Sequence, residues 1–120
     1  MLDFKGNILI TGASSGIGEA MSKQLATVAG TLILVARRTE RLLELSDLCK
    51  AKNPSLTVFV FSYDLGDPQA VRQLLEELKA QSIEVNILIN NAGMGDIGLF
   101  ESIESAKLEN MLMLNVVGLS

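Results

Sequence analysis

A glycine-rich stretch near the N-terminus, TGASSGIG at residues 11–18, has the residue types and spacing of a phosphate-binding turn. It follows the short apolar run NILIT, residues 7–11, and precedes a helical pattern. Glycines allow a tight strand-to-helix turn and leave the backbone open to a ligand's phosphates. The N–H groups and dipole of the following helix favour that charge, and Ser14 and Ser15 can add hydroxyl donors. Glycine-rich turns also occur without a ligand, but the placement between a buried strand and an amphipathic helix favours a nucleotide.

Two arginines, Arg37 and Arg38, follow a second apolar run, TLILVA at residues 31–36. Folds that bind NAD usually carry an acidic residue here, about 20 residues after the glycines, which accepts a hydrogen bond from the ribose 2′-hydroxyl. Guanidinium groups instead suit a 2′-phosphate, through charge and paired N–H donors. The alternative is a solvated pair that starts a surface helix. The missing acid and the present bases together favour NADP over NAD, and Arg41 extends the basic cluster.

Asp64 stands just after a third apolar run, where open α/β sheets bind their ligands. Its carboxylate could accept a hydrogen bond from an adenine amino group. An aspartate that only makes a turn is nearly as good an interpretation on the local evidence. Tyr63, the only tyrosine, is interpreted as a packing residue.

The fourth apolar run ends in INNAG, residues 89–93. Its two consecutive amides, Asn90 and Asn91, could tie the end of the sheet to neighbouring loops. Ala92 has a small side chain and Gly93 has none, so that a flat ribose could lie close over the backbone. Asparagine-rich turns are common, and this motif is weak when it is taken alone.

A further amide, Asn115, falls in an apolar helical stripe near the end of the chain. A buried amide without a partner costs about 1–3 kcal/mol, and we therefore expect Asn115 to have a defined partner. Helical periodicity alone leaves two readings open, a functional side chain or a bond to the backbone that stiffens the fold.

These motifs need strands and helices to position them, and apolar runs of strand length alternate with helical patterns along the chain. The sequence predicts strands over 7–11, 31–36, 55–61 and 85–89, helices over 16–29 and 39–52 and from Pro68, and a last helix from about Glu104 after a glycine-rich loop at 93–98. Thr39 is a possible N-cap, and Asp67-Pro68 reads as a cap followed by an N1 proline. The inward-facing stripes are Ile17, Met21, Leu25 and Val28; then Leu42, Leu45 and Leu48; then Val71, Leu74, Leu75 and Leu78.

Strand–helix alternation with short connections predicts a Rossmann-type doubly wound α/β fold, with a parallel sheet, right-handed crossovers and helices on both faces. We expect the strand order 3-2-1-4. The 120 residues predict a single domain without linkers or repeats, an NAD(P)-binding unit over residues 1–120.

Composition excludes several classes of function. The net charge of −4 argues against a nucleic-acid surface. No histidine is present, which excludes imidazole catalysis and His-ligated metal from this chain, and a single cysteine, Cys49, cannot form an intrachain disulfide. The N-terminus lacks a signal peptide's apolar region, and no apolar run could span a bilayer. These features predict a soluble protein of the cytoplasm.

Taken together, the motifs from about Asn7 to Asn115 resemble the classical short-chain dehydrogenase/reductase family in their order and spacing. They are TGASSGIG, then Asp64-Leu65, then NNAG, then the asparagine of NVVG. The ARR after the second strand resembles its NADP-preferring members. The resemblance implies a cofactor-binding set and one catalytic residue, Asn115, which would hold a proton-relay water. The cofactor-binding set would be Gly12, Ser14, Ser15, Gly16, Ile17 and Gly18 for the pyrophosphate and its ribose, Arg37 and Arg38 for the 2′-phosphate, Asp64 and Leu65 for the adenine, and Asn91, Ala92 and Gly93 for the ribose path.

One departure from the family pattern follows Asn115. The family's catalytic serine and its Tyr-x-x-x-Lys pair would come after this position, and the printed sequence ends at Ser120. Tyr63 cannot substitute, since position 67 is aspartate. We therefore expect the cofactor-binding half of a longer enzyme, inactive alone, with the fourth strand left as an exposed apolar edge.

The resemblance implies an NADP-dependent oxidoreductase that passes hydride between the nicotinamide and the carbonyl or alcohol carbon of a small-molecule substrate. A homo-oligomer is expected for the full-length form. The alternatives are a non-catalytic dinucleotide-binding module, which would bind NADPH without reductase activity, and a structural subunit, which would fold without binding it. A methyltransferase on the same general fold is disfavoured, because NNAG and NVVG have no role there.

Overall fold

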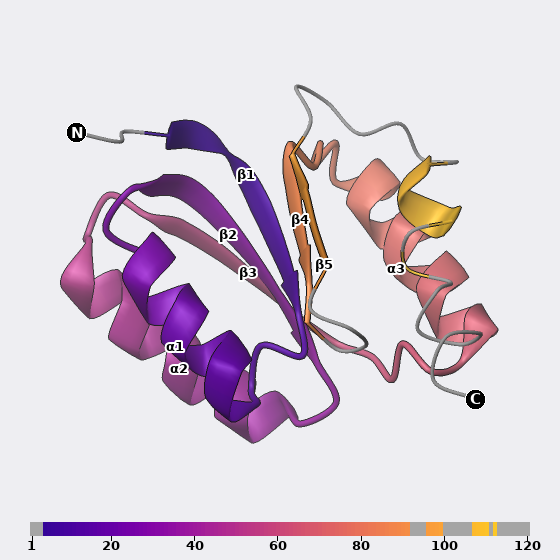
Figure 1. Ribbon diagram of the computed structural model, residues 1–120, viewed down its shortest axis with the longest axis horizontal. Coiled ribbons are helices and arrows are strands. Elements are labelled where there is room, and N and C mark those ends of the chain that lie inside the picture. The colour runs from indigo at the N-terminus through magenta and orange to yellow at the C-terminus, as the bar shows by residue number, and fades with distance from the viewer. Residues whose placement is uncertain (1–3, 92–95, 100–106, 111, 113–120) are drawn as a thin grey trace.

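The computed structural model describes residues 4–91, 96–99, 107–110 and 112 of the chain. Its strands and helices alternate from the N-terminus as far as the fourth strand, and a fifth strand follows (Figure 1). The elements are β1 (Phe4–Thr11), α1 (Gly16–Leu25), β2 (Ala29–Ala36), α2 (Thr39–Lys52), β3 (Thr57–Ser62), α3 (Pro68–Ala80), β4 (Ile87–Asn90) and β5 (Asp96–Leu99). Residues 107–110 and 112 are also helical.

One sheet with the strand order β3-β2-β1-β4-β5 forms the centre of the molecule. The first four strands pair in parallel, which confirms the predicted doubly wound fold and the order 3-2-1-4. In this register Thr11 lies beside Val35 and Asn90, and Ala36 lies beside Ser62. The carboxyl ends of four strands therefore meet at one edge of the sheet, where parallel α/β sheets bind ligands.

Helices cover both faces of the sheet. Figure 1 shows α1 and α2 on one side and α3 with the short helical stretch at 107–110 and 112 on the other. Successive strand residues point to opposite faces: Ile8 and Ile10 belong to the buried cluster under α1 and α2, whereas Leu9 belongs to the cluster under α3. Because helices cover both faces, residues on both sides of these strands are apolar, and the strand sequences are nearly continuous apolar runs. None of the helices in the described ranges is long and apolar enough to cross a membrane.

The helix starts confirm one predicted cap and correct another. Asp67 caps α3 by accepting a hydrogen bond from the Gln69 N–H at 3.0 Å, and Pro68 takes the first helical position, as predicted. Thr39 is not the N-cap of α2. The N-cap is Arg38, whose carbonyl accepts the first intrahelical bond, from the Leu42 N–H at 3.2 Å.

Two predicted stripe positions are wrong. Ile17, in the first turn of α1, is 68% exposed and does not belong to the buried face of that helix. Leu48 is 48% exposed, and Cys49 takes the inward position in the third turn of α2 beside Leu42, Leu45 and Ser46.

The sequence suggested that the fourth strand would be an exposed edge, and this prediction is wrong. Residues 96–99, which fall largely within the predicted loop at 93–98, form β5 and pair antiparallel with β4, with Ile87 beside Leu99 and Asn90 beside Asp96. The pairing gives the outer N–H and C=O groups of β4 partners that a free edge would leave open. Elsewhere the observed strand and helix bounds differ from the predicted ones by a few residues.

Candidate dinucleotide site

The turn between β1 and α1 is held by hydrogen bonds that converge on one carbonyl. Gly12 has a positive φ of 61°, a conformation that glycine adopts without strain. Its oxygen accepts hydrogen bonds from the Ser15 N–H at 3.1 Å, the Ser15 hydroxyl at 2.8 Å and the Asn91 side-chain amide at 3.3 Å. The Ser15 oxygen also accepts from the Asn91 amide at 2.9 Å and caps α1 at the Gly18 N–H, 3.4 Å away. The turn is therefore fixed by the chain's own groups.

Gly18 brings the helix close to this turn. A Cβ at Gly18 would lie 2.1 Å from the Gly12 oxygen and 2.9 Å from the Asn91 side-chain nitrogen. A Cβ at Gly16 would meet nothing within 4 Å, and Ile17 projects into solvent. Gly18 thus serves close packing of helix on turn, whereas Gly16 leaves open space at the start of the helix.

The amides at the end of β4 tie strands and turn together, as the sequence predicted. Asn90 is buried, and its side-chain oxygen accepts a hydrogen bond from the Thr11 hydroxyl at 2.7 Å. Asn91 makes the two bonds to the glycine turn described above. Ala92, Gly93 and Asn115, which the sequence also places in the site, lie outside the described residues.

A hollow of about 570 Å³ opens beside the turn, at the carboxyl ends of β1, β2 and β3. It is lined by seven of the residues that the sequence predicted for the cofactor site and by four that the sequence did not assign to it. The predicted ones are Gly12, Ser14, Ser15, Arg37, Arg38, Asp64 and Leu65, and the additional ones are Ala36, Arg41, Tyr63 and Gly66. Gly16, Ile17, Gly18 and Asn91 are not part of the lining but belong to the adjoining turn.

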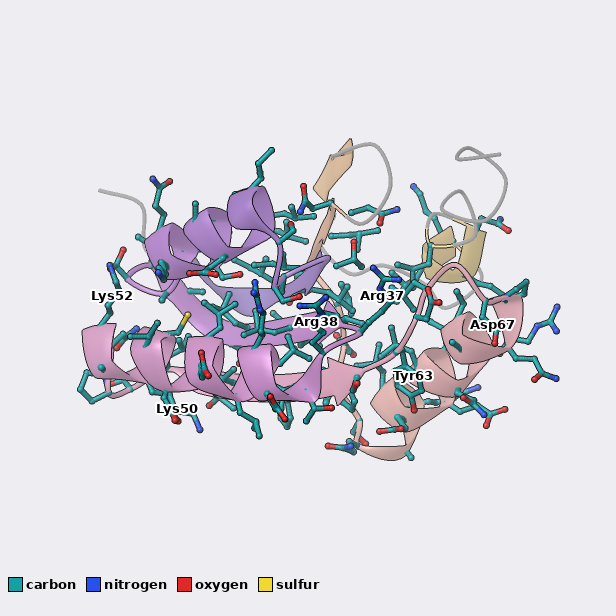
Figure 2. The ribbon with its side chains drawn as sticks, turned by 90° about the horizontal axis from the view of Figure 1, so that it is seen from below. Arg37, Arg38, Lys50, Lys52, Tyr63 and Asp67 are labelled. Atoms are coloured by element: carbon teal, nitrogen blue, oxygen red, sulfur yellow. The ribbon has the colours of Figure 1, made fainter. Side chains whose placement is uncertain are left out.

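Three arginines line this hollow, and none of them forms an ion pair with a carboxylate among the described residues. Arg37, Arg38 and Arg41 are exposed, and within the described ranges the ion pairs are Lys23–Glu19 at 2.9 Å and Arg72–Glu109 at 3.6 Å. Figure 2 shows Arg37 and Arg38 at the start of α2, with Lys50 and Lys52 at its opposite end. Arg38 and Arg41 are three residues apart at the helix start, a spacing that could have drawn Arg41 into the predicted site.

Asp64 makes a turn, which was the alternative that the sequence left open. One carboxylate oxygen accepts a hydrogen bond from the Gly66 N–H at 3.0 Å, and the backbone oxygen accepts from the Asp67 N–H at 3.0 Å. The side chain is exposed on the hollow, so that its second oxygen stays available to a donor. Leu65 is buried against the α3 face of the sheet.

Tyr63 is more than the packing residue that the sequence suggested. Its ring packs against the α3 cluster and also lines the hollow, and its hydroxyl donates a hydrogen bond to the Glu77 carboxylate on α3. That hydrogen bond, together with burial and the negative charges of Glu77 and Glu76, raises the pKa of Tyr63 to about 12. The hydroxyl therefore stays protonated at neutral pH.

Comparison with known proteins identifies the group to which this architecture belongs. The family model described as short chain dehydrogenase matches residues 6–120. A very-long-chain 3-oxoacyl-CoA reductase from Ajellomyces capsulatus is 34% identical over 92% of this chain and 33% of its own length. The 11-beta-hydroxysteroid dehydrogenase 1A of Arabidopsis thaliana is 37% identical over 81% of this chain and 28% of its own length.

A solved structure agrees with these sequence relatives. The bulky-bulky ketone specific alcohol dehydrogenase from Comamonas testosteroni superposes with a TM-score of 0.67 at 32% identity, over 94% of this chain and 46% of that one. The chain thus spans about a third of the length of the first relatives and about half of this structure. On the match over residues 6–120, this chain belongs to the short-chain dehydrogenase family.

Proposed function

We propose that the chain binds NADP(H) in the hollow at the carboxyl ends of β1, β2 and β3. The observation that carries this proposal is the combination of an open glycine turn at the start of α1 with three guanidinium groups that line the same hollow. The turn offers main-chain N–H groups to a pyrophosphate. The arginines offer the charge and paired donors that a 2′-phosphate needs.

The remaining residues take roles along the cofactor from its adenine end. Asp64, through its second oxygen, and Leu65 would contact the adenine, and Arg37 and Arg38 the 2′-phosphate. Asn91 would face the ribose next to Ala92 and Gly93, and Asn115 would hold the proton-relay water. The pyrophosphate and its ribose would be held by Gly12, Ser14, Ser15, Gly16, Ile17 and Gly18.

For the protein of which these residues form the binding part, we propose an oxidoreductase reaction on a carbonyl or alcohol. The bound cofactor would give a hydride to a carbonyl carbon or accept one from an alcohol carbon, and the chain's own residues would orient it. The fixed turn at Gly12 and the tie from Asn91 keep the main-chain donors in place before any ligand arrives, which limits the ordering that binding requires. The Tyr-x-x-x-Lys pair is not among the 120 residues, and we expect this chain to bind NADPH without turnover.

Replacing both arginines tests the assignment. For Arg37→Ala with Arg38→Ala, we expect NADPH affinity to fall roughly ten- to a hundredfold, since hydrogen bonds to charged groups are lost. NADH affinity, which has no 2′-phosphate to lose, should change little. Isothermal titration calorimetry with each cofactor measures the ratio of the NADPH affinity to the NADH affinity.

A matched control is available on the same helix. Lys50→Ala with Lys52→Ala removes the same charge at the far end of α2 (Figure 2) and should leave both affinities near those of the unmodified chain. Equal losses of NADPH and NADH binding in the arginine variant would contradict the 2′-phosphate assignment. A folded chain that binds neither cofactor would instead favour a structural subunit.

A further inference from the structure

Tyr63 has contacts that the proposed cofactor roles do not use. It is the first residue after β3, and its backbone N–H donates to the Ala36 oxygen at the end of β2, at 3.0 Å. Its hydroxyl donates to the Glu77 carboxylate, in the third turn of α3. Tyr63 is thus held at its backbone and at its hydroxyl, and the ring between them forms part of the wall of the hollow.

The loop that starts at Tyr63 and ends at Asp67 is bonded throughout. Asp64 accepts from the Gly66 and Asp67 N–H groups, and Asp67 caps α3. Figure 2 shows Tyr63 beside α3 and Asp67 at the start of that helix. Local bonds therefore set the shape of the loop, whereas the Tyr63–Glu77 bond sets where its first residue lies against α3.

We propose that Tyr63 is a positioning residue for the adenosine end of the dinucleotide, acting through the bond of its hydroxyl to Glu77. This inference rests on the proposed function and adds a residue pair to it. The bond holds the ring in the wall and keeps the segment from Asp64 to Leu65, which follows Tyr63, in place beside the base. Holding binding groups in place before the ligand arrives reduces the ordering that binding must bring about.

The competing interpretation is that Tyr63 only packs against α3. A packing role would alter stability and every part of the site alike. A positioning role would alter binding of the adenosine end and leave the glycine turn as it is. Two probes separate these effects: adenosine 2′,5′-bisphosphate, which needs the β2 and β3 loops, and inorganic pyrophosphate, which needs the glycine turn.

The experiment measures both probes by competition with NADPH on the 120-residue chain. Tyr63→Phe keeps the ring and removes the hydroxyl, and we expect roughly three- to tenfold weaker binding of adenosine 2′,5′-bisphosphate with pyrophosphate binding unchanged. Glu77→Ala should have the same effect, and the double variant should be no worse than either single one. Glu77→Gln keeps an acceptor oxygen and should restore most of the affinity.

Glu76→Ala is the matched control, since it removes a neighbouring carboxylate of α3 that does not bond the hydroxyl. It should bind both probes as the unmodified chain does. Unchanged binding in Tyr63→Phe, or equal losses for both probes, would overturn the positioning role while leaving NADPH binding by the unmodified chain intact. Absence of any NADPH binding by the folded, unmodified chain would overturn the proposed function and this inference together.

Discussion

Gly18 is the residue at which the cofactor turn tolerates substitution least. Its missing side chain faces a backbone oxygen, that of Gly12, and a Cβ there would lie 2.1 Å from it. Backbone cannot rotate away as a flexible side chain can, and relief must come from moving the helix start. We therefore expect Gly18→Ala to lower the free energy of unfolding by about 1–3 kcal/mol, a typical cost of overpacking, as measured by urea unfolding.

Gly16 provides the comparison within the same turn. A Cβ at Gly16 meets no atom within 4 Å, and alanine favours the helix over glycine. Gly16→Ala should leave the free energy of unfolding unchanged or slightly raised. Equal destabilisation by the two substitutions would show that helix–turn contact is not what requires glycine at position 18.

Tyr63 can be titrated directly, because it is the only tyrosine and the chain has no tryptophan. Its hydroxyl bond to Glu77 is the main cause that raises its pKa to about 12 from an ordinary 10. Since the folded-state pKa is the higher one, the stabilisation is fully present below about pH 10 and is lost as the pH rises from there through about 12. Tyrosinate absorbance should show a midpoint near 12 in the folded chain and near 10 in urea. A folded-state midpoint near 10 would contradict the bond.

Among the elements, α3 ends in an unusual way. Ser82 has a φ of 56°, a left-handed conformation in which a side chain is strained. The Ile83 and Ser82 N–H groups donate back to the Leu78 and Lys79 oxygens at 2.8 and 3.1 Å, the pattern that usually carries glycine after a helix. We expect Ser82→Gly to raise the free energy of unfolding by about 0.5–1 kcal/mol.

The preceding residue is the control for this substitution. Gln81 caps α3 with a negative φ of −95°, so that glycine there relieves no strain and adds unfolded-state entropy. Gln81→Gly should lower the free energy of unfolding. A gain at both positions, measured by thermal unfolding, would mean that backbone strain at Ser82 is not the cause.

Sequence periodicity predicted these elements well where each residue's burial depends on its own helix or strand. The alternating strands and helices, the Asp67 cap and the order of four strands were all predictable. Periodicity failed at Leu48, because Cys49 contacts the Ser22 oxygen of α1 and so takes the inward position. It also failed for β5, since that strand depends on an open edge at β4 rather than on its own composition.

At the scale of the whole molecule, the site forms because the strands pair in parallel. The lining comes from the loops after β1, β2 and β3, which meet because their strands end side by side. Motif spacing predicted the glycines, the arginine pair and Asp64, which are local signals. Arg41 could have been assigned from its spacing to Arg38. Tyr63 could not be assigned in this way, since its role depends on its contact with α3 and on its place in the wall of the hollow.

The two faces of the sheet should unfold together, because the same strands carry both buried clusters. Leu74 of α3 is fully buried in one cluster, and Cys49 of α2 is buried in the other. We expect Leu74→Ala to lower the free energy of unfolding by about 2–5 kcal/mol. Tyr63 fluorescence reports the α3 face and Cys49 thiol labelling reports the α2 face. Both should shift to the same lower urea midpoint, as a two-state domain requires. A shift of the Tyr63 signal alone would show that α3 leaves the sheet while α1 and α2 stay folded on it.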